Sequence, residues 1–185
     1  MKKRLFVAIN LDNAAKLALA KIIAQLPDSP AFNKIRVDNQ HLTLQFLGDT
    51  EEELIPQIQE ILNNTATKYP ALELNFTSLG AFPNWQQPNI IWIGIGGPHL
   101  KDLQVELAHQ LIKIAPTMDT KPFQPHLTLA RVKFLPSPTE SAKIQFLKNN
   151  IVLPPITKVS SIDLMASTLT PQGPIHTTLS QHRLA

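Results

Sequence analysis

The chain has 185 residues, of which 43% are hydrophobic and 17% charged, and its formal net charge at pH 7 is +3. This composition fits a globular protein and excludes a disordered or fibrous one, and the modest positive charge permits an anionic partner without a polybasic tail. Because there is no cysteine, disulfides, thiolate nucleophiles, iron–sulfur clusters and cysteine-based zinc sites are excluded as well.

The chain opens with a predicted strand and helix. Residues 4–11 are apolar enough for a buried strand. Asp12 follows at a position suited to a helix N-cap, and the helix is expected over residues 13–26, before Pro27. The first elements therefore alternate between strand and helix.

A second strand and helix follow. Residues 41–47 predict a strand that Gly48 closes, and Thr50-x-x-Glu53 has the spacing of a capping box for the next helix. Pro56 either kinks that helix or means that its regular part begins near Ile55.

Two neighbouring strands and an amphipathic helix occupy the middle of the chain. Residues 72–79 and 89–96 are rich in β-forming side chains and are separated by a loop. Pro98 suits the first position of a helix whose apolar residues step by three and four along one face. These apolar residues are Leu100, Leu103, Leu107, Leu111 and Ile114.

The last third of the chain repeats the order of strand and helix. Residues 126–134 predict a strand, and Ser137-Pro138-x-Glu140 is an N-terminal signature for a helix that ends near Asn149. Two final strands are expected over residues 159–168 and 175–182.

The two halves of the chain share a tetrapeptide as well as an order of elements. His-Leu-Thr-Leu occurs at residues 41–44 and 126–129, an offset of 126 − 41 = 85 residues, which is close to half the chain. In both halves the tetrapeptide begins a strand that precedes a capped helix. The repeat therefore indicates an internal duplication, with the two halves related by a pseudo-twofold axis.

The repeated tetrapeptide is suited to acid–base chemistry. Alternate side chains of a strand share a face, so the leucines turn to the core while His41 projects with Thr43, and His126 with Thr128. If the two strands are adjacent, one imidazole can donate a proton and the other accept it near neutral pH, while the hydroxyls donate to an anion between them. A lone histidine on a strand is usually structural, but the matched pair favours catalysis.

Five segments of the chain carry a resemblance to a known family. They are Arg4-Leu-Phe-Val-Ala-Ile9, Asp38-Asn-Gln-His-Leu-Thr-Leu-Gln-Phe-Leu-Gly48, Gly80-Ala-Phe-Pro83, Ile90-Ile-Trp-Ile-Gly94 and Lys121-Pro-Phe-Gln-Pro-His-Leu-Thr-Leu-Ala-Arg131. With its two H-x-T-x motifs, the chain resembles the 2H phosphoesterase superfamily. It resembles in particular the bacterial and archaeal RNA 2′,3′-cyclic phosphodiesterases of that superfamily, also called 2′-5′ RNA ligases.

The resemblance implies a fold and an activity. The implied fold is α+β and bilobal, with two antiparallel sheets that face a central cleft and helices outside. Residues 1–185 are then expected to form a single 2H phosphoesterase domain of two intertwined lobes, each with one H-x-T-x motif. The implied activity is the metal-independent hydrolysis of RNA or nucleotide 2′,3′-cyclic phosphates to 2′-phosphomonoesters, with no cofactor and no metal ligands.

The resemblance also implies roles for five residues. The histidine that matches His41 is taken as the proton donor and the one that matches His126 as the proton acceptor, so both are the expected catalytic residues. Thr43, Thr128 and Arg131 are expected to bind the substrate phosphate. For Arg131 a second interpretation stands beside this one, because a guanidinium equally suits solvent or a neighbouring carboxylate.

Two parts of the chain depart from what the resemblance leads us to expect. Relatives often carry arginines between Pro83 and Ile90, where this chain has Trp85 among amide side chains. Trp85 either packs in the usual way, which is the more common role, or stacks on a nucleobase. His176 stands where we expect a tyrosine, and Phe46 is expected to pack in the core beneath the cleft.

The remaining histidines do not predict a metal site. His99 and His109 are ten residues apart near and within one predicted helix, so we expect them on the surface. His176 and His182 have the even spacing that puts two residues on one face of a strand, but no carboxylate accompanies them.

Three functions remain open from the sequence. The first is hydrolysis of terminal cyclic phosphates on RNA ends, including tRNA fragments, or on small nucleotides. The second is 2′-5′ RNA ligation at the same site, and the third is a non-catalytic module that binds an RNA or nucleotide phosphate. Intact copies of both histidines and both threonines argue against the third.

The sequence also favours a cytoplasmic monomer with no membrane partner. The apolar run at residues 5–9 is interrupted by Asn10 and Asp12, and no small-residue cleavage site follows it. The longest apolar stretch, residues 90–97, is far short of the roughly 18 residues that a membrane span needs.

Overall fold

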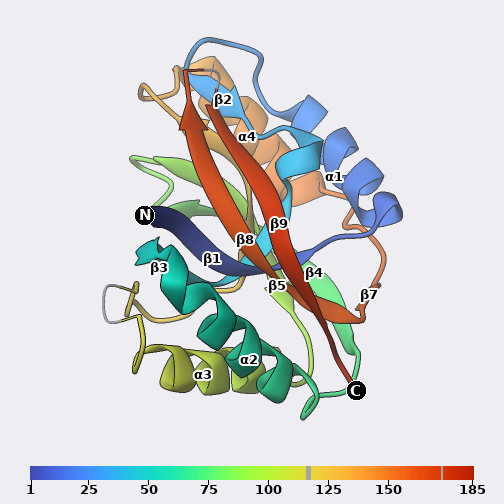
Figure 1. Cartoon of the computed structure of the whole chain (residues 1–185). Coiled ribbons are helices and arrows are strands. Elements are labelled where there is room, and N and C mark those ends of the chain that lie inside the picture. The colour runs from blue at the N-terminus through green and yellow to red at the C-terminus, as the bar shows by residue number, and fades with distance from the viewer. Residues whose placement is uncertain (116–117, 172) are drawn as a thin grey trace.

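The computed structural model describes residues 1–115, 118–171 and 173–185, and its elements follow the predicted order (Figure 1). Its strands are β1 (Lys2–Asn10), β2 (Phe32–Lys34), β3 (His41–Glu51), β4 (Leu72–Phe82), β5 (Ile90–Gly96), β6 (His126–Val132), β7 (Thr157–Val159), β8 (Ser161–Thr170) and β9 (Gly173–Arg183). Its α-helices are α1 (Asn13–Gln25), α2 (Ile55–Ala66), α3 (Leu100–Leu111) and α4 (Pro138–Asn150).

The strands form two antiparallel sheets, each of which contains one H-x-T-x strand. The first sheet has the order β3-β1-β8-β9 and the second β2-β6-β5-β4-β7. Strand β1 lies between β3 and β8 just as β5 lies between β6 and β4. Since β4 comes from the first half of the chain while β8 and β9 come from the second, each half supplies strands to both sheets.

The helices lie on the outer sides of the sheets. Helix α2 contacts β8 and β9, and it lies beside α3 at the lower end of the molecule in Figure 1, whereas α1 contacts β6 and lies with α4 at the upper end. The two sheets therefore face each other with helices outside, which confirms the predicted α+β architecture.

Strand β1 is buried on both of its faces, which explains its unbroken apolar sequence. Leu5, Val7 and Ile9 belong to the main core, whereas Phe6 and Ala8 pack with Met165 in a separate cluster on the opposite face. At about 25 cal/mol per Å² of buried apolar surface, a fully buried leucine or isoleucine contributes roughly 1.5–3 kcal/mol.

Two helix starts confirm the sequence prediction. The Asp12 side chain accepts a hydrogen bond from the backbone N–H of Ala15 at 2.7 Å and caps α1. Ser137 and Glu140 form a complete capping box at the start of α4. In both cases a short polar side chain satisfies a backbone donor that the helix itself leaves unpaired.

The predicted end of the second strand and start of the second helix are wrong. Strand β3 continues past Gly48, which has φ 75° beside a bulge in the β1–β3 pairing, and runs to Glu51. Thr50 therefore lies in the strand, where its hydroxyl donates to the Gly48 carbonyl instead of capping a helix. A 3₁₀ turn over Glu52–Leu54 leads into α2, which begins at Ile55, the second of the two alternatives for Pro56.

The predicted start of the third helix is also wrong by two residues. His99 is the N-cap and has φ 61°, a left-handed conformation that separates Pro98 from the helix. Helix α3 therefore begins at Leu100, and its four leucines are buried as the spacing predicts. Two short strands, β2 and β7, were not predicted, because each has only three residues.

Candidate active site

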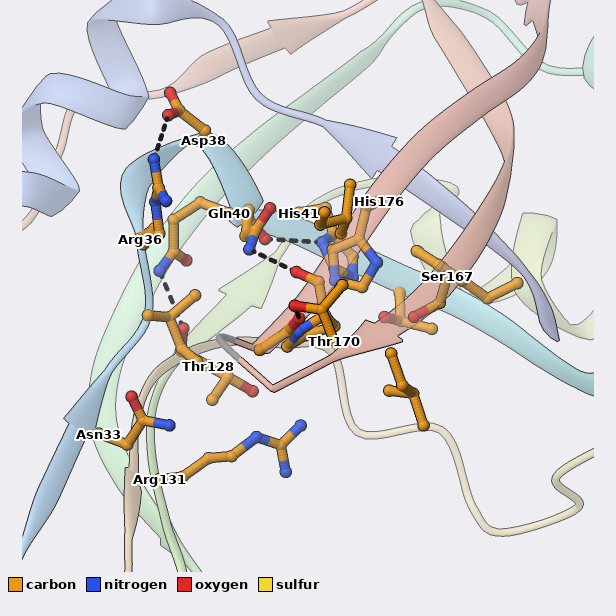
Figure 2. Close-up of a pocket in the computed structure, with 18 of the residues that line it drawn as sticks. Asn33, Arg36, Asp38, Gln40, His41, Thr128, Arg131, Ser167, Thr170 and His176 are labelled. Atoms are coloured by element: carbon orange, nitrogen blue, oxygen red, sulfur yellow. Dashed lines mark hydrogen bonds and ion pairs between the residues drawn. The ribbon is translucent and has the colours of Figure 1, made fainter.

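A cavity of about 730 Å³ lies between the two sheets (Figure 2). Strands β1, β3, β8 and β9 line it on one side and β2 and β6 on the other. Of the predicted site residues, it is lined by His41, Thr43, Thr128 and Arg131. His126 is not among its lining residues; it lies on the same strand as Thr128, two residues earlier.

Both motif strands have the predicted alternation of buried and half-buried side chains. In each motif the two leucines are buried, while the histidine and the threonine are partly exposed on the opposite face. Among the residues that the structure describes, the hydroxyls of Thr43 and Thr128 have no hydrogen-bond partner, so both can bind a ligand. The prediction that the histidine and threonine of each motif project together is therefore confirmed.

One buried side chain joins the two motif strands. Gln40, which directly precedes His41, is 1% exposed, and its Nε2 donates to the backbone carbonyl of Thr128 at 3.0 Å (Figure 2). Near this contact the backbone N–H of Ile35 donates to the carbonyl of Leu129 at 2.9 Å. The chain just before the first motif is thus fixed to the strand of the second.

The two motif histidines are held by the same kind of hydrogen bond. Nδ1 of His41 lies 2.8 Å from the carbonyl oxygen of Asn39, and Nδ1 of His126 lies 2.6 Å from that of Gln124. Because a carbonyl oxygen can only accept, Nδ1 carries the proton in both rings. Nε2 is therefore the nitrogen that gains or loses a proton in each.

Aromatic rings fix the orientation of both imidazoles. The His41 ring lies 4.9 Å from that of Phe6, and the His126 ring lies 5.0 Å from that of Phe82 and 5.9 Å from that of Trp92, measured between centroids. Such packing restricts each imidazole to one rotamer, which is what a positioned acid or base requires.

Burial keeps both motif histidines neutral at pH 7. It lowers the pKa of His41 from 6.5 to about 4; the charge of Lys16 and the cationic forms of His176 and His126 add to this lowering, and the bond to Asn39 opposes it. Burial also lowers the pKa of His126, and the bond to Gln124 opposes this shift.

A bulge in β6 turns Arg131 toward the cavity. Thr128 pairs with Trp92 and Arg131 with Ile90, so three steps along β6 match two steps along β5. The extra residue puts Arg131 on the same face as Thr128, although their odd spacing in sequence predicts opposite faces. The same shift occurs in β3, where Thr43 pairs with Ala8 and Phe46 with Phe6.

Phe46 therefore occupies in the first motif strand the position that Arg131 has in the second. Phe46 is half-buried, packs against Phe6 and lines the cavity, with the guanidinium of Arg4 5.0 Å from its ring centroid. It was expected to lie wholly beneath the cleft, and the bulge is the reason that it reaches the surface of the cavity.

Positive side chains outnumber negative ones around the cavity. Among the described residues the lining includes Arg4, Lys34, Arg36 and Arg131 but one carboxylate, Asp38. Asp38 is paired with Arg36 at 3.9 Å, and no ion pair involves Arg131 in the described part of the chain. The guanidinium of Arg131 therefore has no neighbouring carboxylate among these residues, and it lines the cavity, where an anion can reach it.

Several lining residues were not identified from the sequence. Asn39 and Gln40 adjoin the first motif and could have been found there, whereas others come from segments that no motif marks. These others are Asn33, Arg36, Ser167 and Thr170.

His176 and His182 lie on opposite faces of β9, which corrects the prediction from their even spacing. His176 pairs with Ser167 and lines the cavity, whereas His182 pairs with Ile162 and is buried on the other face. A bulge between them, near Thr178 and Ser180, is the cause. As predicted, His99 and His109 are exposed.

Trp85 packs against the core. It is partly buried, and Nζ of Lys148 lies 5.2 Å from the centroid of its ring. A face covered by a lysine is not open to a nucleobase, so the packing interpretation of Trp85 holds.

The described residues hold neither a cluster of metal ligands nor a membrane-spanning helix. Across residues 1–115, 118–171 and 173–185, no three His, Asp or Glu side chains come together as metal ligands. Within the same residues, no helix has the length and apolar character needed to cross a membrane.

Comparisons with known proteins agree with this arrangement. A family model described as the 2′-5′ RNA ligase superfamily matches residues 15–167. The chain is 31% identical over 188 residues to the RNA 2′,3′-cyclic phosphodiesterase of Methanothermobacter thermautotrophicus, with 100% of both chains covered. It is 32% identical over 179 residues to the RNA 2′,3′-cyclic phosphodiesterase of Thermotoga maritima, covering 95% of this chain and 92% of that relative.

A solved structure shows the same fold. The crystal structure of the protein TT0787 of Thermus thermophilus matches with a TM-score of 0.85 and 26% sequence identity, covering 98% of this chain and 97% of the other.

Proposed function

The chain belongs to the 2′-5′ RNA ligase superfamily, and on that basis we propose that it is an RNA 2′,3′-cyclic phosphodiesterase. It opens the cyclic phosphate at an RNA end, or on a small nucleotide, and leaves a 2′-phosphomonoester. The observation that carries this proposal is the matched orientation of His41 and His126, each with Nδ1 bonded to a backbone carbonyl and Nε2 left to exchange a proton.

In the proposed reaction the two histidines have different roles. Nε2 of neutral His126 takes a proton from the water that attacks phosphorus, and a new bond forms from phosphorus to that oxygen. The bond from phosphorus to the ribose 3′ oxygen breaks, and His41 gives that oxygen a proton. His126 thus accepts one proton and His41 donates one, and neither transfer requires a metal ion.

The acid role of His41 depends on the substrate. With a pKa of about 4, His41 is neutral at pH 7. A phosphate anion beside the ring favours its protonated form and raises that pKa. Binding of the anionic substrate and proton uptake at His41 are therefore coupled.

The phosphate itself is held by donors from both motif strands. The hydroxyls of Thr43 and Thr128 and the guanidinium of Arg131 line the same cavity as His41, and none of the three has a partner among the described residues. A planar guanidinium can give two parallel hydrogen bonds to phosphate oxygens, and a hydroxyl gives one. The excess of positive charge around the cavity suits the same anion.

We include four further points in this proposal. Residues 1–185 act as a single domain of two intertwined lobes, because each half of the chain supplies strands to both sheets. The protein works as a monomer, since one chain supplies both H-x-T-x motifs. It is cytoplasmic, which fits a chain without cysteine, and tRNA fragments with cyclic phosphate ends are among its substrates.

The test uses two RNA oligomers in the presence of EDTA, one ending in a 2′,3′-cyclic phosphate and the other beginning with a 5′-hydroxyl. We expect the first to be converted to an oligomer of the same length with a 2′-phosphate. A longer product with a 2′-5′ bond would make ligation the main activity, and binding without any product would leave only the phosphate-binding module.

A further inference from the structure

The cavity contains a third imidazole that the reaction above does not use. His176, on β9, lines the cavity beside His41 (Figure 2). Its ring centroid lies 5.1 Å from that of His41 and 5.2 Å from that of Phe6, with interplanar angles of 81° and 77°. Since Phe6 and His41 are themselves 4.9 Å apart, the three rings form a closed triangle that holds His176 in place.

The two nitrogens of His176 have different surroundings. Nδ1 is buried and, among the residues that the structure describes, has no hydrogen-bond partner. Nε2 is therefore the ring nitrogen that is open to the cavity. A proton on Nδ1 would bury an unpaired N–H and turn a lone pair toward the anion, so the neutral ring binds an anion only with its proton on Nε2.

His176 is neutral at pH 7 because burial lowers its pKa. The groups around it are Phe6 from β1, His41 from β3 and Ser167 from β8, none of them a carboxylate that would favour the charged ring. It supplies the cavity with a fixed N–H donor and no charge.

We propose that His176 is a third phosphate-binding side chain of this cavity, whose Nε2–H donates a hydrogen bond to a non-bridging oxygen of the substrate phosphate beside His41. His176 keeps its proton throughout the reaction. The inference rests on the proposed function for the identity of the substrate, while the donor itself suits any phosphate ester or inorganic phosphate.

The first test compares two substitutions with a matched control. His176→Phe keeps the ring but removes the donor, and we expect kcat/KM for a cyclic nucleotide to fall about 10- to 100-fold, as for loss of a hydrogen bond to a charged group. His176→Asn, which restores an N–H donor, should recover part of the loss, with both limbs of the pH profile still present. His109→Phe, at an exposed position on α3, should behave as the wild type.

Equal activity of wild type and His176→Phe would overturn the proposal, as would a failure of His176→Asn to exceed His176→Phe. Complete loss of one pH limb in His176→Phe would also overturn it, because it would assign His176 a proton-transfer role.

A second test does not depend on activity or on the folding of a variant. In ¹⁵N spectra of the wild-type histidines, addition of inorganic phosphate should shift the His176 Nε2–H signal while Nδ1 stays unprotonated. An unchanged His176 signal, or a proton on Nδ1, would contradict the proposal. A shifted signal in a protein that hydrolyses no cyclic phosphate would leave this inference standing and reject the proposed function.

Discussion

Gln40 Nε2 and the backbone carbonyl of Thr128 are 3.0 Å apart, and this hydrogen bond links two residues that are 88 positions apart in the chain. Gln40 is 1% exposed, so water does not compete for the bond. Through it, the residue next to His41 is held against the strand that carries Thr128 and His126. The relative position of the two motifs depends on this contact as well as on the sheets.

Replacement of Gln40 should therefore affect both stability and turnover. Gln40→Leu leaves the Thr128 carbonyl unpaired in a buried place, and we expect the free energy of unfolding to fall by about 1–3 kcal/mol. Turnover should fall as well, because the motif strands are less precisely placed. Gln25→Leu is the control: its Nε2 also donates to a backbone carbonyl, that of Lys21, but on the exposed surface of α1. Similar denaturation curves and rates for the two variants would reject a special role for Gln40.

Acidic pH should destabilise the protein through His41. The unfolded chain binds a proton at this residue below about pH 6.5, whereas the folded protein does so only near its pKa of about 4. The free energy of unfolding is therefore highest above about pH 6.5 and falls as the pH drops from there toward 4. Between about pH 7.5 and about pH 5 we expect His41 alone to account for a loss of about 2 kcal/mol. Urea unfolding of the wild type and of His41→Gln at both values measures this loss, and an equal pH dependence in the two proteins would refute the assignment.

Arg131 should bind the phosphate through two parallel hydrogen bonds and not through its charge alone. If it grips two phosphate oxygens, Arg131→Lys should lower kcat/KM nearly as much as Arg131→Gln, because an ammonium cannot make two parallel bonds. We expect a loss of about 10-fold or more for both, as for loss of a charge-assisted hydrogen bond. Arg183→Gln, at an exposed position on β9 outside the cavity, is the matched control. Full activity in Arg131→Gln would mean that the Arg131 guanidinium faces solvent and does not bind the phosphate.

The choice of acid and base can be tested with the leaving group. Nitrophenolate is a stable anion that needs no proton, so a nucleotide ester with this leaving group should be hydrolysed by His41→Ala far better than the cyclic phosphate is. His126→Ala should stay inactive on both substrates. Rescue of His126→Ala alone would reverse the two roles, and a 3′-phosphate product from the cyclic substrate would mean that the nucleotide sits the other way round.

Short sequence motifs predicted the helix starts and strand faces that depend on contacts between neighbouring residues. Asp12 and Ser137 mark helix starts because each satisfies backbone donors within one turn, and the two H-x-T-x strands show their faces through strict alternation. The bulges were not predictable in this way, because an extra residue in one strand is defined only by its partner. They are the reason that Arg131 and Phe46 share a face with the threonines before them and that His176 and His182 do not share one.

The rest of the site depends on contacts between distant segments. Nothing near Gln40 in the sequence indicates a bond to Thr128, and the three-residue strand β2, which brings Asn33 to the cavity, is too short for a pattern. In the sequence His176 differs from its surroundings only as a departure from an expected tyrosine, because its place beside His41 requires the pairing of β8 and β9.

The most direct test of the central claim follows a nucleoside 2′,3′-cyclic phosphate by ³¹P NMR in EDTA, with the wild type, His41→Ala, His126→Ala and the double variant. We expect the cyclic signal to be replaced by that of the 2′-phosphomonoester. Each single variant should be slower by about 10²- to 10⁴-fold. The double variant should be little slower than the worse single one, because both protons move in one displacement. Circular dichroism should show that all four proteins are folded. Wild-type rates in either single variant, or activity that stops in EDTA and returns with a divalent ion, would contradict the account.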